Sequence, residues 1–144
     1  AKTARRRSRE LALQGLYSWQ LTRASADDLV RQLSEARGFD KADRAFFEQL
    51  LRGCIDAVAE LESLLQPLLD RKPEALSPVE RSILMLGAWE LKRSADVPYR
   101  VVINEAVELA KIYGGTDGHK YVNGVLDKLA RTLREEPGAP APAA

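Results

Sequence analysis

The sequence has little of the chemistry that catalytic and metal sites need. Its 144 residues include one cysteine, Cys54, and one histidine, His119. A lone cysteine excludes an internal disulfide, and these two residues do not supply the ligands of a structural zinc site. Cys54 falls on an apolar helical stripe, where cysteine typically behaves as a small buried hydrophobe. No pair of carboxylates stands out as catalytic, so we expect no enzyme, no metal and no cofactor.

Long hydrophobic runs are also absent. No apolar stretch approaches the roughly 20 residues of a membrane-spanning helix, and the N-terminus lacks the apolar segment of a signal peptide. We therefore expect no membrane association and a cytoplasmic location.

Acidic residues are missing from one end of the chain. Residues 1–9 contain five of the 22 basic residues and no acid, whereas the rest of the chain carries 17 basic and 21 acidic residues. We call residues 2–9 the arginine arm; its basic members are Lys2, Arg5, Arg6, Arg7 and Arg9. A basic arm on a mildly acidic body indicates either an anionic partner such as nucleic acid or a solvated N-terminus. Arginines oppose the dipole at the start of a helix, which favours the first interpretation.

Helical periodicity runs through almost the whole sequence, and alternating β-branched runs are absent. About six helices are expected, one of them long and continuous from Asp40 or Asp43 to Leu68. Helix starts are signalled by Ser25 and, most clearly, by Ser77-Pro78-Val79-Glu80, a capping box with proline at the first helical position. The prediction is one all-α domain over residues 1–134, with sub-bundles at about 1–70 and 77–134 separated by Pro73–Pro78. Residues 135–144 are rich in proline and alanine and are expected to be disordered.

The segment from Tyr113 to Tyr121 is a second candidate binding region, because two tyrosines flank the turn GGTDGHK. Such a turn exposes backbone N–H groups, and tyrosine rings stack on unpaired bases. Alternatively, both tyrosines belong to the core and Asp117 is the N-cap of the last helix. The turn is not a phosphate-binding P-loop, because its glycine spacing is one residue short and it follows a helix.

Four stretches together resemble the NusB family of bacterial transcription antitermination factors. They are ARRRSRELALQGLYSWQL, LSPVERSILMLGAWEL, DVPYRVVINEAVELAKIYGG and DGHKYVNGVLDKLA. The resemblance implies two packed three-helix bundles and a protein that binds single-stranded boxA RNA of ribosomal RNA transcripts. It also implies a heterodimer with NusE, a protein of the small ribosomal subunit. Other Nus factors and RNA polymerase would complete the antitermination complex.

The resemblance also implies site residues by position. RNA contacts fall on Lys2, Arg5, Arg6, Arg7, Arg9, Tyr113, Asp117, Lys120 and Tyr121, and NusE contacts fall on Tyr17, Glu74 and Glu80. The family often has phenylalanine at the two tyrosine positions, and tyrosine keeps the stacking face. Gly118 stands where serine is common, which removes a hydroxyl from the turn.

Two other interpretations stay open. Domains similar to NusB occur as RNA-binding accessory domains of ribosomal RNA methyltransferases, although 144 residues leave no room for a cofactor-binding α/β domain. The third interpretation is a helical adaptor protein whose arginine arm is solvated and inert.

Overall fold

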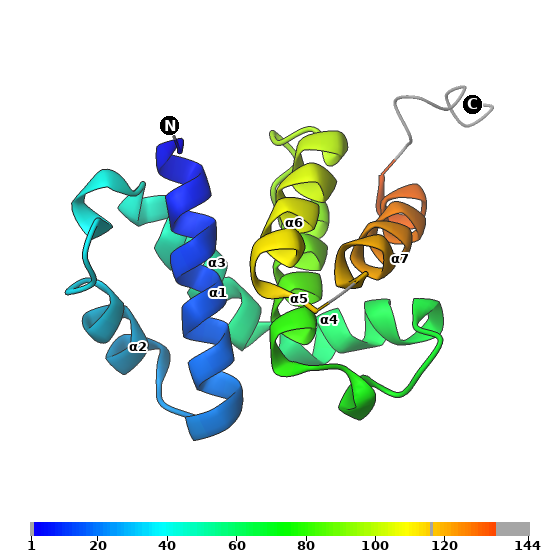
Figure 1. Cartoon of the computed structure of the whole chain (residues 1–144), viewed down its shortest axis with the longest axis horizontal. Coiled ribbons are helices and arrows are strands. Elements are labelled where there is room, and N and C mark those ends of the chain that lie inside the picture. The colour runs from blue at the N-terminus through cyan, green and yellow to red at the C-terminus, as the bar shows by residue number, and fades with distance from the viewer. Residues whose placement is uncertain (1, 116, 135–144) are drawn as a thin grey trace.

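Every regular element of the computed structural model, which describes residues 2–115 and 117–134, is helical. This confirms the predicted all-α class, while the predicted disordered tail lies outside the described residues. The helices are α1 (Ala4–Thr22), α2 (Ala26–Leu33), α3 (Arg44–Asp56), α4 (Val58–Leu65), α5 (Pro78–Arg93), α6 (Tyr99–Tyr113) and α7 (Gly118–Leu133) (Figure 1). Short 3-10 turns lie at Phe39–Lys41, Gln66–Leu68 and Pro73–Ala75.

Short polar side chains begin most of these helices. The Ser25 and Ser77 hydroxyls accept the N–H groups of Asp28 and Glu80, each at 3.1 Å, which confirms both predicted starts. Pro78 occupies the first position of α5, where its missing N–H costs nothing. Thr3 caps α1 in the same way by accepting the Arg6 N–H at 3.0 Å. Local sequence therefore determines where these helices begin.

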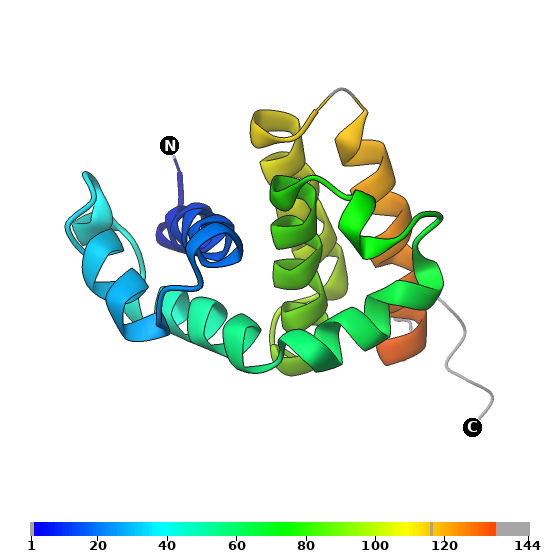
Figure 2. The same cartoon turned by 90° about the horizontal axis from the view of Figure 1, so that it is seen from below.

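The predicted long helix is divided in two at Ala57. The backbone there takes φ −104° and ψ 17°, outside helical values, and α3 gives way to α4. α3 packs on α1, α2 and α5, whereas α4 packs on α5 and α7. One straight helix would not face both sets of neighbours, and the chain changes direction between the two segments (Figure 2). We therefore propose that the boundary between the two sub-bundles lies at Ala57 rather than at Pro73–Pro78.

α5 is the central helix, since it packs against α1, α3, α4, α6 and α7. All residues from Ser82 to Ala88 are buried, as are Glu90 and Leu91, so α5 is enclosed on nearly every side. Cys54 of α3 is fully buried against α5, with its Sγ 3.6 Å from the Met85 carbonyl oxygen. Burial raises the pKa of the Cys54 thiol well above its usual range. The expectation of a small, buried cysteine is confirmed.

A buried ion pair joins α1 to α5. The Arg9 guanidinium donates through Nε and Nη2 to the two carboxylate oxygens of Glu90, both at 2.8 Å. Their side chains are only 6% and 3% exposed. The Phe46 ring covers the Arg9 guanidinium at 5.0 Å. Because both charges have left water, the pair tolerates neither a shift nor a rotation of α1 that would separate them.

The close approach of α3 to α5 depends on Gly53, because a Cβ there would lie 2.7 Å from Cζ2 of Trp89 and closer still to its Nε1. Gly53→Ala is therefore expected to lower the free energy of unfolding by about 1–3 kcal/mol through overpacking. Gly124 on α7 has open space around it and is the matched control. Gly124→Ala should instead stabilise the protein by about 0.5–1 kcal/mol. Urea unfolding measures both, and equal effects would contradict the proposed Gly53 contact.

Removing one member of the buried ion pair should cost much more than removing an exposed one. Arg9→Met leaves the Glu90 carboxylate buried and unpaired, so we expect a loss of about 3–5 kcal/mol in unfolding free energy. Arg9→Met with Glu90→Leu should recover most of that loss. Arg44→Met, which breaks an exposed pair with Glu48, should cost less than about 1 kcal/mol. If Arg9→Met were as stable as Arg44→Met, the buried Glu90 carboxylate would not need Arg9 as its cation.

Candidate nucleic-acid interface

The arginine arm forms the first turns of α1, and its basic side chains lie in different surroundings. Lys2 is exposed and pairs with Glu10, with Nζ 2.9 Å from Oε2. Arg5 is 44% exposed, lies over the Phe46 ring at 4.2 Å and has Nε 3.9 Å from Asp43 Oδ2. The long distance to Asp43 makes this a weak ion pair. Arg5 therefore combines an exposed charge with an aromatic support.

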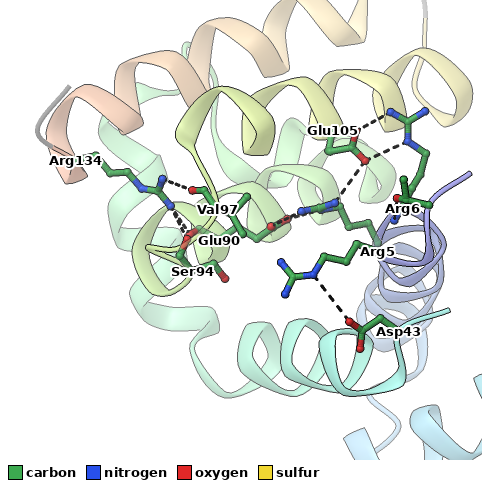
Figure 3. Close-up of polar contacts among 10 residues, drawn as sticks. Arg5, Arg6, Asp43, Glu90, Ser94, Val97, Glu105 and Arg134 are labelled. Carbon is green, nitrogen blue, oxygen red and sulfur yellow. Dashed lines mark hydrogen bonds and ion pairs between the residues drawn. The ribbon is translucent and has the colours of Figure 1, made fainter. Parts of the chain in front are cut away.

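Arg6 and Arg9 instead meet carboxylates from α5 and α6 (Figure 3). Arg6 donates through Nε and Nη2 to the two oxygens of Glu105 at 3.1 and 2.6 Å. Arg9, already paired with Glu90, also reaches Glu105 through Nη1 at 3.5 Å. The hydrogen bond from Arg6 lowers the pKa of Glu105, although partial burial opposes this, and it raises the pKa of Arg6. Two cations and two anions therefore balance in this cluster.

Arg7 points another way, beside the turn between α2 and α3. A Cβ on Gly38 would lie 3.7 Å from Arg7 Nη1. Arg7 is half-buried, and no acidic side chain within residues 2–115 and 117–134 forms an ion pair with it. Arg5 and Arg7 are therefore the arm arginines least committed to other parts of the fold, whereas Arg9 is not available on the surface.

A groove of about 600 Å³ lies between the arm and the start of α6. Val97 and the exposed Val101 supply apolar lining, and Arg5, Arg6 and Glu105 supply charge. The groove thus offers guanidinium groups next to an apolar surface, which suits a nucleotide with its phosphate and its base.

The second candidate region lies where α6 ends and α7 begins. Tyr113 is the last residue of α6 and is 43% exposed. Asp117 is the N-cap residue of α7, as the alternative interpretation has it, but its side chain makes no capping hydrogen bond. With φ at 65° the residue is not in the extended conformation from which a capping side chain reaches the helix N–H groups. The Asp117 carboxylate instead lies 3.4 Å from Lys120 Nζ.

Tyr121 and Lys120 point to different surroundings. The Tyr121 ring is half-buried under the Arg71 guanidinium, 4.4 Å from the ring centroid, and burial raises the pKa of its hydroxyl. Lys120 is exposed and lines a groove of about 570 Å³ between α6 and α7, together with His119 and Asn123. The structure thus exposes Tyr113 for stacking but covers one face of Tyr121.

α6 connects the arm with the turn. Glu105, which meets the arm, and Tyr113, which meets the turn, are separated by about 12 Å along the helix. Val101, Ile112 and Tyr113 are exposed apolar residues of the same helix. Figure 2 shows α1 above α3, and the adjoining ends of α6 and α7 above α4. The two regions predicted from sequence are thus linked by one helix.

The predicted protein-facing residues lie on three segments: Tyr17 on α1, Glu74 on the 3-10 turn Pro73–Ala75 and Glu80 in the first turn of α5. Tyr17 is 40% exposed, and Glu74 is exposed on a 3-10 turn. Gln20 of α1 donates to the Ser82 hydroxyl of α5 at 2.6 Å, which holds these two segments together. Glu80 reaches back to Ser77 as expected, but it accepts from the Ser77 hydroxyl, at 3.2 Å.

The residues that sequence reasoning missed are the partners of the arm. Glu90 and Glu105 bind Arg9 and Arg6, and Phe46 supports Arg5. Glu90 carried a usable signal, because a carboxylate within the apolar run LGAWEL must find a cation if it is buried. No such signal marked Glu105 in the sequence, because acidic residues on an amphipathic helix usually face water.

No group of three or more histidine, cysteine, aspartate or glutamate side chains in the described part of the chain is arranged to hold a metal ion. No helix in residues 2–115 and 117–134 combines the length and apolar character needed to cross a membrane.

Comparison with known proteins identifies the family. Residues 6–131 match the NusB family. The transcription antitermination protein NusB of Paraburkholderia xenovorans (strain LB400) is 57% identical over 135 residues, which cover 94% of each chain. Among solved structures, NusB of T. maritima superposes with a TM-score of 0.79 at 33% identity, covering 91% of this chain and 93% of that one.

A third similar structure contains a complex. It is a crystal structure of the antitermination factors NusB and NusE with dsRNA, whose matching chain has a TM-score of 0.78 at 25% identity. The match covers 88% of this chain and 96% of that one. With its arginine arm, its α6–α7 turn and its full-length similarity to these relatives, the chain belongs to the NusB family of transcription antitermination proteins.

Proposed function

We propose that this protein is an RNA-binding transcription antitermination factor. It binds boxA RNA of ribosomal RNA transcripts together with NusE, and with other Nus factors it helps RNA polymerase read through terminators. The observation that carries this proposal is that the arginine arm and the exposed Tyr113 both adjoin α6. The arm contacts Glu105 of this helix, and Tyr113 is its last residue. No reaction is catalysed, and the site of action is the cytoplasm.

Single-stranded RNA suits the two regions best. Arg5 and Arg7 offer guanidinium groups to phosphates, and Tyr113 offers a ring face to a base. Stacking on Tyr113 requires an unpaired base, because a base inside a duplex is already stacked on its neighbours. Within the site inferred from the resemblance, we assign phosphate contacts to Lys2, Arg5, Arg6, Arg7 and Lys120. We assign no phosphate contact to Arg9, because it is buried with Glu90.

NusE is the proposed protein partner, as it is in the solved NusB–NusE complex. The proposed NusE-binding surface of this chain includes Tyr17, Glu74 and Glu80. Leu21, one turn beyond Tyr17 on α1, is 60% exposed and extends this surface with an apolar side chain. The surface therefore presents an aromatic ring and an aliphatic side chain with acids beside them, which suits a basic partner.

The direct test is an RNA titration of the protein alone and with NusE. Single-stranded boxA RNA, a scrambled single strand and a boxA duplex are compared at two salt concentrations. We expect the boxA strand to bind most tightly, with a further gain when NusE is present. Equal binding of the scrambled strand would argue against boxA recognition, and tighter binding of the duplex would argue against stacking on Tyr113.

Arg5 and Arg7 together should account for about two phosphate contacts. Arg5→Gln with Arg7→Gln is expected to weaken RNA binding roughly tenfold and to reduce the salt slope by about 1.4. Arg31→Gln is the matched control, since Arg31 is an exposed arginine of α2 paired with Asp28. The control should leave the slope unchanged. An unchanged slope in the double variant would exclude Arg5 and Arg7 from the RNA site.

Asp117 places a negative charge beside the proposed RNA surface. Asp117→Asn should tighten RNA binding by about threefold at low salt, because it removes repulsion and releases Lys120 from its ion pair. Asparagine tolerates the left-handed backbone at this position, so the fold should persist. Asp28→Asn, which breaks an exposed pair with Arg31 on α2, is the control. Weaker or unchanged RNA binding by a folded Asp117→Asn variant would contradict this role.

A further inference from the structure

Glu105 lies between two arginines that differ in how firmly they are held. Arg6 is 36% exposed and uses Nε and Nη2 on the two Glu105 oxygens. Arg9 is 6% exposed and makes its two short hydrogen bonds to Glu90, so its contact with Glu105 at 3.5 Å is secondary. Glu105 itself is 13% exposed. One carboxylate is thus shared by a surface arginine and a buried arginine.

The consequences of losing each arginine are unequal. If Arg9 left, Glu90 would be a buried carboxylate without its cation, at a cost of several kcal/mol. If Arg6 left, Glu105 would still have Arg9 Nη1 nearby, so no carboxylate would be left without a cation. Arg6 is also the most exposed member of the cluster, so a ligand reaches its guanidinium more readily than that of Arg9. Arg6 is therefore the one member of the cluster that can change partners at small cost.

We propose that Arg6 and Glu105 form an exchangeable phosphate site, in which the Glu105 carboxylate occupies the arginine until an RNA phosphate replaces it. This inference rests on the proposed RNA-binding function and adds Glu105 as a residue that sets RNA affinity. A phosphodiester presents two oxygens to a guanidinium much as a carboxylate does, so it takes the same bidentate position. Glu105 then retains Arg9, and the buried part of the cluster does not rearrange.

The surrounding charges fit such an exchange. Besides Glu105, the Arg6 guanidinium is influenced by Glu108 and Glu10. Glu108 pairs with Lys111 at 3.3 Å, and Glu10 pairs with Lys2 at 2.9 Å. Among the residues that the structure describes, Glu105 is the one carboxylate that holds Arg6 directly, so it is the competitor that RNA must displace. The same groove exposes Arg5 next to Arg6, which gives the incoming phosphate a second cation.

Glu105→Gln tests the exchange directly. Glutamine keeps the shape of the side chain but removes the charge that competes with phosphate. We expect single-stranded boxA RNA to bind about three- to fivefold more tightly to the variant. The salt slope should also steepen by about 0.7, because the Arg6 charge is then free to neutralise one more phosphate. Arg9 keeps Glu90 in this variant, so its thermal unfolding midpoint should stay close to that of the wild type.

Glu108→Gln is the matched control. It removes the same charge from α6, within one turn of Glu105, but breaks only a surface pair with Lys111. We expect Glu108→Gln to raise RNA affinity less than Glu105→Gln does and to leave the salt slope of RNA binding unchanged. RNA binding that is unchanged or weaker in a folded Glu105→Gln variant would overturn the exchange, because Glu105 would then orient Arg6 rather than compete for it.

A second measurement uses only the wild-type protein. The Nε–H signals of Arg6 and Arg9 are followed by NMR, alone and with RNA, in the presence of NusE. The Arg6 signal should move on RNA addition while the Arg9 signal stays in place, because Arg9 keeps Glu90. A stationary Arg6 signal with bound RNA overturns the exchange but leaves the proposed function intact. RNA that binds neither the wild type nor the Glu105→Gln variant contradicts both.

Discussion

The buried Arg9–Glu90 pair is the interaction on which the arrangement of the helices depends. Two charges removed from water must remain opposite each other, and this fixes both the position and the rotation of α1 against α5. Arg9 extends the constraint to Glu105 on α6. At the end of α7, Arg134 donates to the carbonyl oxygens of Glu90 and Ser94, among others, near the end of α5 (Figure 3). Three helices, α1, α5 and α6, therefore meet around one cluster of charge, and Arg134 holds the end of α7 to the backbone beside it.

This constraint also explains how a run of arginines can begin a helix. The dipole at a helix N-terminus repels cations, so the arm is locally unfavourable. The fold compensates with acids from elsewhere: Asp43 from the start of α3 for Arg5, and Glu105 from α6 for Arg6. The folded arm is consequently less basic toward a ligand than its sequence indicates. The charge that sequence analysis assigns to nucleic acid is partly used to hold the two halves of the protein together.

Sequence reasoning predicted the structural features that neighbouring residues determine. It missed the features that depend on residues far away in the chain. Ser25 and Ser77 lie three residues before the N–H groups they cap, so a short window of sequence contains the whole interaction. The break at Ala57 has no local signal, because it depends on which helices α3 and α4 later pack against. Of the candidate site, the arm and turn were identified by composition and resemblance. The burial of Arg9 was not, since its partner is 81 residues away.

The arginine arm and the α6–α7 turn each contain a cation paired with an acid, and the two ion pairs differ in their exposure to solvent. Each places a cation in contact with an acid: Arg6 with Glu105 near the arm, and Lys120 with Asp117 at the turn. Asp117 is 67% exposed, whereas Glu105 is 13% exposed, so dissolved ions screen the turn pair far more than the arm pair. Rising salt therefore frees Lys120 before it frees Arg6. Because the same salt weakens phosphate binding everywhere, the proposed exchange requires a phosphate that competes directly with Glu105 at short range. In this proposal Arg6 favours RNA that other contacts, such as stacking on Tyr113, have already positioned.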